Sequence, residues 1–230
     1  MISICMAVYN GEKYLREQID SILPQLGETD ELIISDDGST DNTLKILDAY
    51  NDLRIKVLKS NGRNIIKNFE NALTHSSGEI IFLADQDDIW YPSKVPECLK
   101  YLRKYDLVFS NVEVFRDDIA DMELFYSKKG TKTGILRNLI KNNYIGATMA
   151  FKRRILEKSL PFPRNIYMHD IWLAMTAEIV GKTFFIEKPL MGYRRHGENA
   201  SQTGEKSSNT LIRKLKIRID LVRNLIHRFS

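Results

Sequence analysis

Three carboxylates lie within four residues at Asp85, Asp87 and Asp88, directly after the apolar run 80–84. The run predicts a buried strand, so the acids follow the carboxyl end of that strand. Hard divalent cations take oxygen ligands, and a cluster of this kind can hold a metal beside a phosphate. Asp is also a common turn residue, so a solvated acidic turn is the alternative for this stretch alone.

Strands and helices alternate at short spacing through the N-terminal half. The apolar periodicity predicts strands at 2–8, 31–35, 55–58 and 80–84, and helices at 14–23, 44–50 and 65–73. This alternation is typical of an α/β fold in which helices cover both faces of a mostly parallel central sheet.

Polar clusters follow three of the predicted strands. They are Tyr9–Asn10, Asp36–Asp37 and Asp85–Asp88. Ligands of parallel sheets bind beyond the carboxyl ends of the strands. We therefore expect one crevice at that edge to collect all three clusters, because independent solvated turns would have no reason to share an edge.

The chain beyond residue 90 has a more mixed pattern. Helices are predicted at 92–105, 135–141, 153 onward and 168–180, and strands at 107–110, 147–151, 184–186 and 191–195. The charged stretch 116–134 is expected to be a loop over the sheet edge. The main domain is predicted to cover residues 1–200, in two halves of about 1–111 and 112–200, and the polar stretch 201–209 is predicted to be a linker.

The basic charge belongs to the C-terminal tail. The whole chain carries a net charge of +4, and residues 210–230 alone carry six Lys and Arg against one Asp, or +5. Residues 1–209 carry a net charge of about −1, so they lack the excess of basic residues that is typical of proteins that bind nucleic acid.

The cysteines and the hydropathy pattern predict a cytoplasmic protein. Cys5 and Cys98 are read as core thiols, which suits a reducing compartment. No apolar stretch reaches the roughly 20 residues of a membrane-spanning helix. The N-terminus begins directly with a strand pattern and lacks the features of a signal peptide.

The tail predicts a basic amphipathic helix at 210–230. Apolar residues recur at intervals of 4, 4, 3, 4 and 3, which places them on one helical face; they are Leu211, Leu215, Ile219, Val222, Ile226 and Phe229. Such a helix is typical of binding to an anionic membrane surface, here the inner face of the cell membrane. Packing on the main domain or on a partner subunit is the alternative.

Four segments in order resemble glycosyltransferase family 2, a family of inverting enzymes with the nucleotide-sugar-binding GT-A fold. They are Ala7–Asn10 with Tyr14–Leu15, Ser35–Asp41, Ala84–Asp88, and His169–Asp170 followed by Arg194–His196. The resemblance covers roughly residues 1–201. It implies a GT-A catalytic domain at 1–200, with a nucleotide-binding half at about 1–111 and an acceptor half at about 112–200. The run from Asp85 to Trp90 resembles bacterial enzymes of surface-polysaccharide assembly, including rhamnosyltransferases.

The resemblance implies transfer of a sugar, with inversion, from dTDP-rhamnose or a UDP-hexose to a glycan or a lipid-linked acceptor. Charge develops on the leaving diphosphate, so a Mg²⁺ or Mn²⁺ ion and cationic side chains are expected beside it. One alternative is a non-catalytic nucleotide-sugar-binding or scaffolding subunit. Another is a nucleotidyltransferase, whose usual Gly-rich phosphate loop is not matched by Tyr9–Glu12.

The resemblance also assigns roles to residues. The catalytic base is Asp170; the metal ligands are Asp87, Asp85 and His196; the nucleotide contacts are Ala7, Tyr9, Asp36, Asp37, Lys67 and Asp85; and the diphosphate or acceptor contacts are Arg194, Arg195, His169 and Trp90. Structural alternatives stay open for several of them. One of the two Asp36–Asp37 carboxylates can be a turn former, Lys67 can lie on a solvated helix face, and Trp90 can pack in the core.

Overall fold

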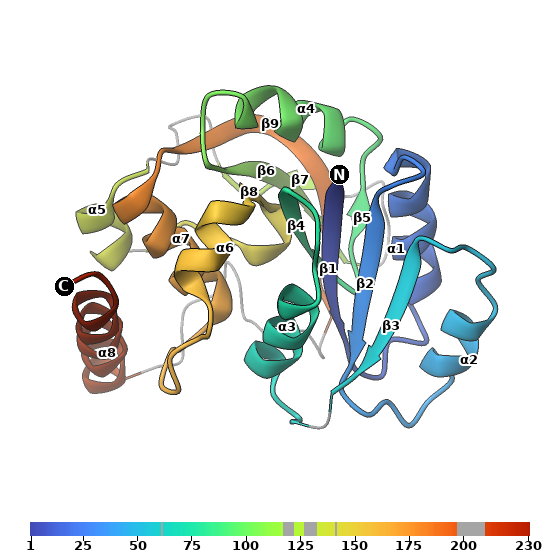
Figure 1. The fold of residues 1–230 in the computed structure, drawn as a ribbon, viewed down its shortest axis with the longest axis horizontal. Helices are drawn as coiled ribbons and strands as arrows, with labels where there is room; N and C mark the ends of the chain where they lie inside the picture. The colour runs from blue at the N-terminus through green and yellow to red at the C-terminus, as the bar shows by residue number, and fades with distance from the viewer. Residues whose placement is uncertain (61, 117–121, 127–132, 141, 197–209) are drawn as a thin grey trace.

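The structure is a computed structural model that describes residues 1–60, 62–116, 122–126, 133–140, 142–196 and 210–230 (Figure 1). Its first half alternates as the periodicity predicts. The elements are β1 (Ile2–Val8), α1 (Leu15–Ile22), the 3₁₀ turn η1 (Leu23–Gln25), β2 (Glu31–Asp36), α2 (Thr43–Asp48), β3 (Ile55–Lys59), α3 (Ile65–Thr74) and β4 (Ile80–Asp85).

The second half departs from the prediction at three expected strands, and it contains two short strands that the sequence pattern does not predict, at 89–90 and, within the expected loop, at 123–124. Its elements are β5 (Ile89–Trp90), α4 (Lys94–Leu102), β6 (Leu107–Phe115), β7 (Glu123–Leu124), α5 (Ile135–Ile140), the 3₁₀ turn η3 (Gly146–Thr148), β8 (Met149–Lys152), α6 (Arg153–Ser159), α7 (His169–Val180), β9 (Thr183–Arg194) and α8 (Leu211–Phe229). The two strands expected at 184–186 and 191–195 are one strand, because β9 pairs with β6 across two register shifts. The strand expected at 147–151 begins with a 3₁₀ turn instead.

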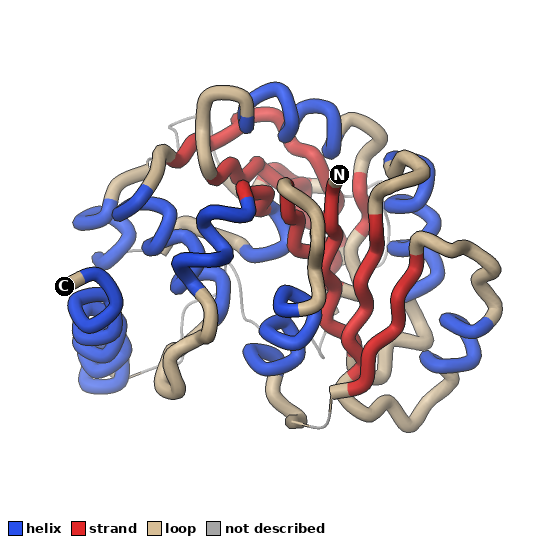
Figure 2. The backbone as a smooth tube through the Cα atoms, viewed as in Figure 1, coloured by secondary structure: helices blue, strands red, loops and turns tan. Residues whose placement is uncertain are grey.

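One sheet joins all the strands that the structure describes, in the order β3-β2-β1-β4-β8-β6-β9-β5, with β7 on the side of β6. Pairing is parallel from β3 through β4, whereas β8 runs antiparallel to both β4 and β6. Figure 2 shows the strands as a curved band with helices on both sides, which confirms the predicted α/β class.

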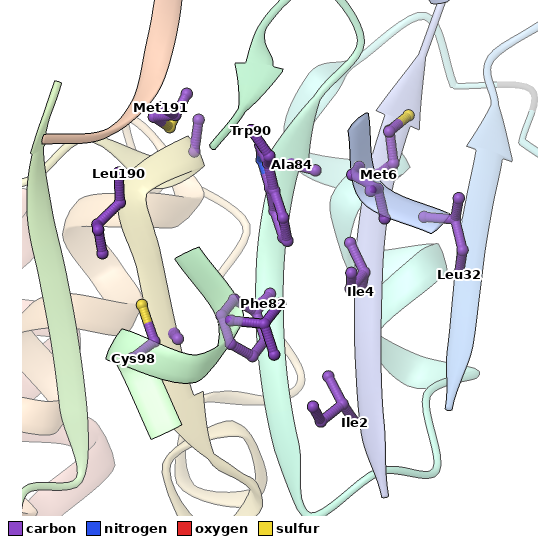
Figure 3. Close-up of a cluster of buried hydrophobic side chains, with 14 of the residues drawn as sticks. Ile2, Ile4, Met6, Leu32, Phe82, Ala84, Trp90, Cys98, Leu190 and Met191 are labelled. Carbon is purple, nitrogen blue, oxygen red and sulfur yellow. The ribbon is translucent and has the colours of Figure 1, made fainter. Parts of the chain in front are cut away.

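β1 is buried on both faces, and its alternating side chains divide the core into two layers. Ile4 and Met6 pack with α1 and α4 on one face (Figure 3). Cys5 and Ala7 pack with α3, α6 and α7 on the other face. A central strand covered on both sides must be apolar along its length, which is why its sequence reads as a continuous apolar run.

The C-terminal helix is present and packs on the second core layer through Leu221 and Leu225. The predicted linker 201–209 lies outside the described residues. Among the helices that the structure describes, none is long and apolar enough to cross a membrane.

Gly78 provides a test of the packing between β1 and β4. A Cβ atom at residue 78 would lie 2.6 Å from the backbone nitrogen of Ser3. We expect Gly78→Ala to lower the free energy of unfolding by about 1–3 kcal/mol, because the backbone must shift to admit the methyl group. Gly27→Ala is the control, since its nearest contact would be the Asp30 carboxylate at 3.4 Å. Urea unfolding measures both variants, and equal stability of the two would contradict the packing described.

Candidate active site

The polar clusters after β1, β2 and β4 meet at one edge of the sheet. Val8 lies opposite Asp36 and Ala7 lies opposite Asp85, so the three strands end side by side. Beyond them is a cavity of about 310 Å³, whose other walls are the start of α3, η3 and the start of α7. The cavity brings together many of the residues singled out in the sequence; they are Ala7, Tyr9, Asp37, Asp85, Asp87, His169 and Asp170.

The two acids after β2 have different surroundings. Asp36 accepts hydrogen bonds from the backbone N–H groups of Gly38 and Ser39, both at 3.1 Å, and does not line the cavity. It is therefore the turn former of the pair. Asp37 lines the cavity and accepts from the N–H groups of Gly62 at 2.9 Å and Asn64 at 2.7 Å, so its carboxylate holds the loop that leads into α3.

Two glutamines fix the chain around the acidic cluster, and the sequence reasoning missed both. The Gln86 side chain accepts from the Tyr9 N–H at 2.9 Å and donates to the Tyr9 carbonyl at 3.1 Å, which joins the loops after β1 and β4. The Gln18 amide donates to the carbonyl of Asp85 at 2.7 Å from the buried face of α1. A buried glutamine on an otherwise apolar helix face is the signal that could have identified Gln18.

Negative charge accumulates at this edge. Burial, followed by the charges of Asp87 and Asp170, raises the pKa of Asp85 to about 7. Asp88 is buried, and burial together with the neighbouring carboxylates raises its pKa well above the ordinary value. One Asp88 oxygen accepts from the N–H of Arg194 at 3.1 Å. The carboxylates therefore repel one another, and a cation between them would relieve the repulsion.

Lys94 supplies a buried positive charge behind the cluster. Its ammonium donates to the carbonyl of Ala147 at 2.6 Å and lies 4.0 Å from the centre of the Trp90 ring. Burial lowers the pKa of Lys94 to about 8, against the raising effect of Asp88 and Asp85. The neighbouring carboxylates thus favour the charged form of Lys94, whereas its burial opposes that form.

Asp87 is held by the end of β9. The imidazole Nε2 of His196 lies 2.7 Å from Oδ2 of Asp87, and the guanidinium of Arg194 donates to the Asp87 carbonyl at 2.9 Å. Arg194 also pairs with Glu17 on α1. These contacts bring His196 and Arg194 to the acid that the resemblance assigns to the metal. Arg195 donates its backbone N–H to the carbonyl of Phe115 at 2.8 Å.

The acidic pair fits a hard divalent cation only when a ligand completes the site. In the described part of the chain, no three His, Cys, Asp or Glu side chains converge to hold a metal ion by themselves. Asp85 and Asp87 offer carboxylate oxygens where negative charge is poorly compensated, and His196 stands against Asp87. Oxygens of a diphosphate and water would supply the remaining coordination of Mg²⁺ or Mn²⁺.

Asp170 lies in the first turn of α7 and lines the cavity. Burial raises the pKa of its carboxyl to about 6, against backbone hydrogen bonds that lower it. Its Oδ1 accepts from the N–H of Ile171 at 2.6 Å. A Cβ atom on Gly146 would lie 3.2 Å from that of Asp170, so a glycine lets η3 pack closely against the carboxylate.

His169 is neutral and unpaired within the described structure. Its ring stacks on Phe69 with 3.9 Å between centroids, and neither ring nitrogen has a hydrogen-bond partner there. Burial lowers the pKa of His169 to about 3. The imidazole can therefore accept or donate one hydrogen bond to a bound molecule without carrying charge.

Two residues expected at the site lie elsewhere. Trp90 is 2% exposed and packs on Phe82 in the core, because β5 pairs with β9 and turns its side chain inward. Its proposed contact with the diphosphate or acceptor is replaced by a core role. Lys67 lies on the solvated face of α3 in an ion pair with Glu70 and does not line the cavity.

Arg63 and Asn68 line the cavity and were not identified from the sequence. Arg63 follows the Gly62 turn and has a positive φ of 42°. Asn68 is buried; its amide donates to the Val8 carbonyl at 3.1 Å, and its Oδ1 has no partner among the described residues. Its polar side chain on the inward face of α3, beside Phe69, was the available signal.

Comparison with known proteins agrees with the fold. The family model described as Glycosyl transferase family 2 matches residues 3–160. The chain is 29% identical to the dTDP-rhamnosyl transferase RfbG of Shigella flexneri, covering 97% of this chain and 81% of that protein.

Two solved structures are similar in fold. The structure of S. aureus TarS 1–349 in complex with UDP-GlcNAc has a TM-score of 0.71 at 18% identity, covering 99% of this chain and 69% of that one. The Pyrobaculum calidifontis mannosyltransferase PcManGT in complex with GDP-Man and Mn²⁺ has a TM-score of 0.62 at 20% identity, covering 84% and 56%. The chain thus spans only part of each protein, and over that part it belongs to glycosyltransferase family 2 and has the GT-A fold.

Proposed function

We propose that this chain catalyses metal-dependent, inverting transfer of a sugar from a nucleoside-diphosphate sugar to a glycan or lipid-linked acceptor in bacterial cell-surface polysaccharide synthesis. The observation that carries the proposal is the cavity itself. Asp37, Asp85 and Asp87 line one side at the ends of parallel strands, and Asp170 lines the other side at the start of α7. Donor and acceptor would meet between these walls.

The donor is assigned to the side of the cavity formed by β1, β2 and α3. Asn68 offers an unpartnered carbonyl oxygen to a base or ribose donor, and Arg63 offers a guanidinium to the diphosphate. The names of the related proteins support dTDP-rhamnose or a UDP-hexose as the donor, since RfbG is named a dTDP-rhamnosyl transferase and TarS was solved with UDP-GlcNAc.

A Mg²⁺ or Mn²⁺ ion held by Asp87 and Asp85, with His196, would stabilise the charge of the leaving diphosphate. The complex of PcManGT with Mn²⁺ supports this assignment. His196 already contacts Asp87, and Arg194 fixes the Asp87 backbone through its carbonyl. These two residues therefore hold the carboxylate in position before a donor binds.

Asp170 is the proposed base. A carboxyl with a pKa of about 6 is ionised at neutral pH and still accepts a proton more readily than an exposed Asp does. The acceptor hydroxyl would lose its proton to Asp170 as its oxygen attacks the anomeric carbon from the face opposite the diphosphate. One displacement of this kind inverts the configuration at that carbon. His169 would orient the hydroxyl through its free ring nitrogen.

Release of nucleoside diphosphate tests the proposal directly. A panel of UDP-, dTDP- and GDP-sugars is incubated with the chain and Mn²⁺, with and without EDTA. We expect one donor class to be consumed and EDTA to abolish the release. Donor binding without release, with a range of acceptors present, would instead favour a non-catalytic nucleotide-sugar-binding subunit.

Asp170→Asn is expected to lower kcat by roughly 10²- to 10⁴-fold, because the amide cannot accept the proton. Donor binding, measured by thermal shift, should be retained. In the parent chain kcat/KM should fall on the acid side with a midpoint near the Asp170 pKa of about 6 in the free enzyme, since protonation removes the base. The exposed Asp48 on α2 gives the matched control Asp48→Asn, which should leave kcat unchanged. Full activity of Asp170→Asn would refute the assignment of the base.

Asp87→Asn is expected to remove the metal response. Ligand that binds only the folded state raises its stability by mass action, so Mn²⁺ with a nucleoside diphosphate should raise the Tm of the parent chain. The variant should lose most of this shift, and Asp48→Asn should keep it. An unchanged shift in Asp87→Asn would place the metal elsewhere.

A further inference from the structure

α8 carries two apolar faces rather than one. The inner face holds Leu221 and Leu225, which are 5% and 7% exposed and pack in the core layer of α3, α6 and α7. Arginines on the same side attach the helix to the domain: Arg218 donates to the Leu139 carbonyl at 2.7 Å, and Arg228 donates to the Leu160 carbonyl at 2.9 Å. The attachment of α8 to the domain is therefore complete without its outer face.

The outer face is uncovered by the part of the chain that the structure describes. Leu211, Leu215, Ile219 and Ile226 recur at helical spacing and are 84%, 60%, 45% and 61% exposed. These residues belong to the stripe that the sequence predicts for this helix. The structure thus divides the predicted stripe, because Phe229 packs against the core layer of the domain, whereas Leu211, Leu215, Ile219 and Ile226 stay exposed.

Helix α5, which Arg218 joins to α8, also carries exposed apolar side chains. Leu136 and Ile140 on α5 are 78% and 74% exposed. Arg218 joins the two helices by binding the carbonyls of Leu139 and Ile140. Figure 1 shows α5 and α8 at the same end of the molecule. Exposed apolar side chains gathered on adjacent helices mark an interaction surface rather than scattered surface residues.

The positive charge beside this surface indicates which kind of partner it binds. Exposed basic residues on α8 include Lys216 and Arg223, which at 100° per residue lie next to the outer stripe. The helix carries a net charge of +5 with Asp220 as its single acid. A second copy docking through the same face would bring two such helices together, and like charges would oppose that contact. An anionic surface is the complementary partner.

We infer that α8 and the adjoining α5 form a docking surface for an anionic lipid bilayer. The stripe of Leu211, Leu215, Ile219 and Ile226 would enter the boundary between headgroups and acyl chains, while Lys216 and Arg223 contact lipid phosphates. The inference goes beyond the proposed function and does not depend on it, because binding to vesicles requires neither donor nor acceptor.

Co-sedimentation with vesicles tests the inference. The 230-residue chain should bind vesicles of mixed phosphatidylglycerol and phosphatidylcholine, and it should bind pure phosphatidylcholine much more weakly. Binding should fall as NaCl increases, because salt screens the attraction to the anionic surface. Release of nucleoside diphosphate in solution is measured on the same samples to separate binding from catalysis.

Paired variants identify the surface. The double variant Leu215→Asp with Ile219→Asp should weaken binding roughly tenfold or more, because it removes buried apolar area and adds negative charge. Lys216→Gln with Arg223→Gln should weaken it roughly fivefold per charge removed. Leu53→Asp is the matched control, since Leu53 is 98% exposed in the loop before β3, and its binding should equal that of the parent chain.

Three outcomes would overturn the inference. They are absence of binding to phosphatidylglycerol vesicles, equal binding by the Leu215→Asp/Ile219→Asp variant, and a concentration-dependent dimer that this variant breaks while vesicles are not bound. The third outcome would assign the face to a second copy of the chain. Circular dichroism and Tm verify that the variants fold, which is expected because the substituted side chains are exposed.

Discussion

Repulsion among carboxylates at one edge of the sheet is the constraint on which the arrangement of the surrounding side chains depends. Burial raises the pKa values of Asp85 and Asp88, and the neighbouring carboxylates raise them further. Asp170 adds to the effect at Asp85. The parallel pairing of β1, β2 and β4 fixes the positions of these acids before any ligand is present. Placing these acids together therefore lowers the stability of the fold, as is common at sites that bind cations.

The neighbouring polar groups limit that cost without removing it. Lys94 places one ammonium behind the cluster, and Gln86 joins the loops after β1 and β4 by two hydrogen bonds. Arg194 reaches the same cluster from the end of β9, a strand far away in the sequence. Each of these groups is aimed at the backbone or at the buried side of the acids. Asp85 and Asp87 still line the cavity.

The N-terminal half could be predicted from the sequence because its information is local. The continuous apolar run of β1 and the helical periodicity of α1 and α3 are visible within ten residues, and acids at strand ends follow from the parallel order. The second half depends on pairing at long range. Trp90 is buried because β5 pairs with β9, about a hundred residues later, and no local pattern encodes that contact. The distinction between Asp36 and Asp37 likewise rests on the course of the loop at Gly62.

The way α8 is attached has a consequence for divergence among related sequences. Arg218 binds main-chain carbonyls at Leu139 and Ile140, and Arg228 binds those at Lys158, Leu160 and Pro161. A peptide carbonyl is present whatever side chain the residue bears. Substitutions in these receiving segments therefore leave the hydrogen bonds of the two arginines intact, provided that the path of the backbone is kept, whereas the packing around Leu221 and Leu225 still depends on side chains. In these hydrogen bonds the residues that supply the carbonyls can be substituted, whereas Arg218 and Arg228 must be kept.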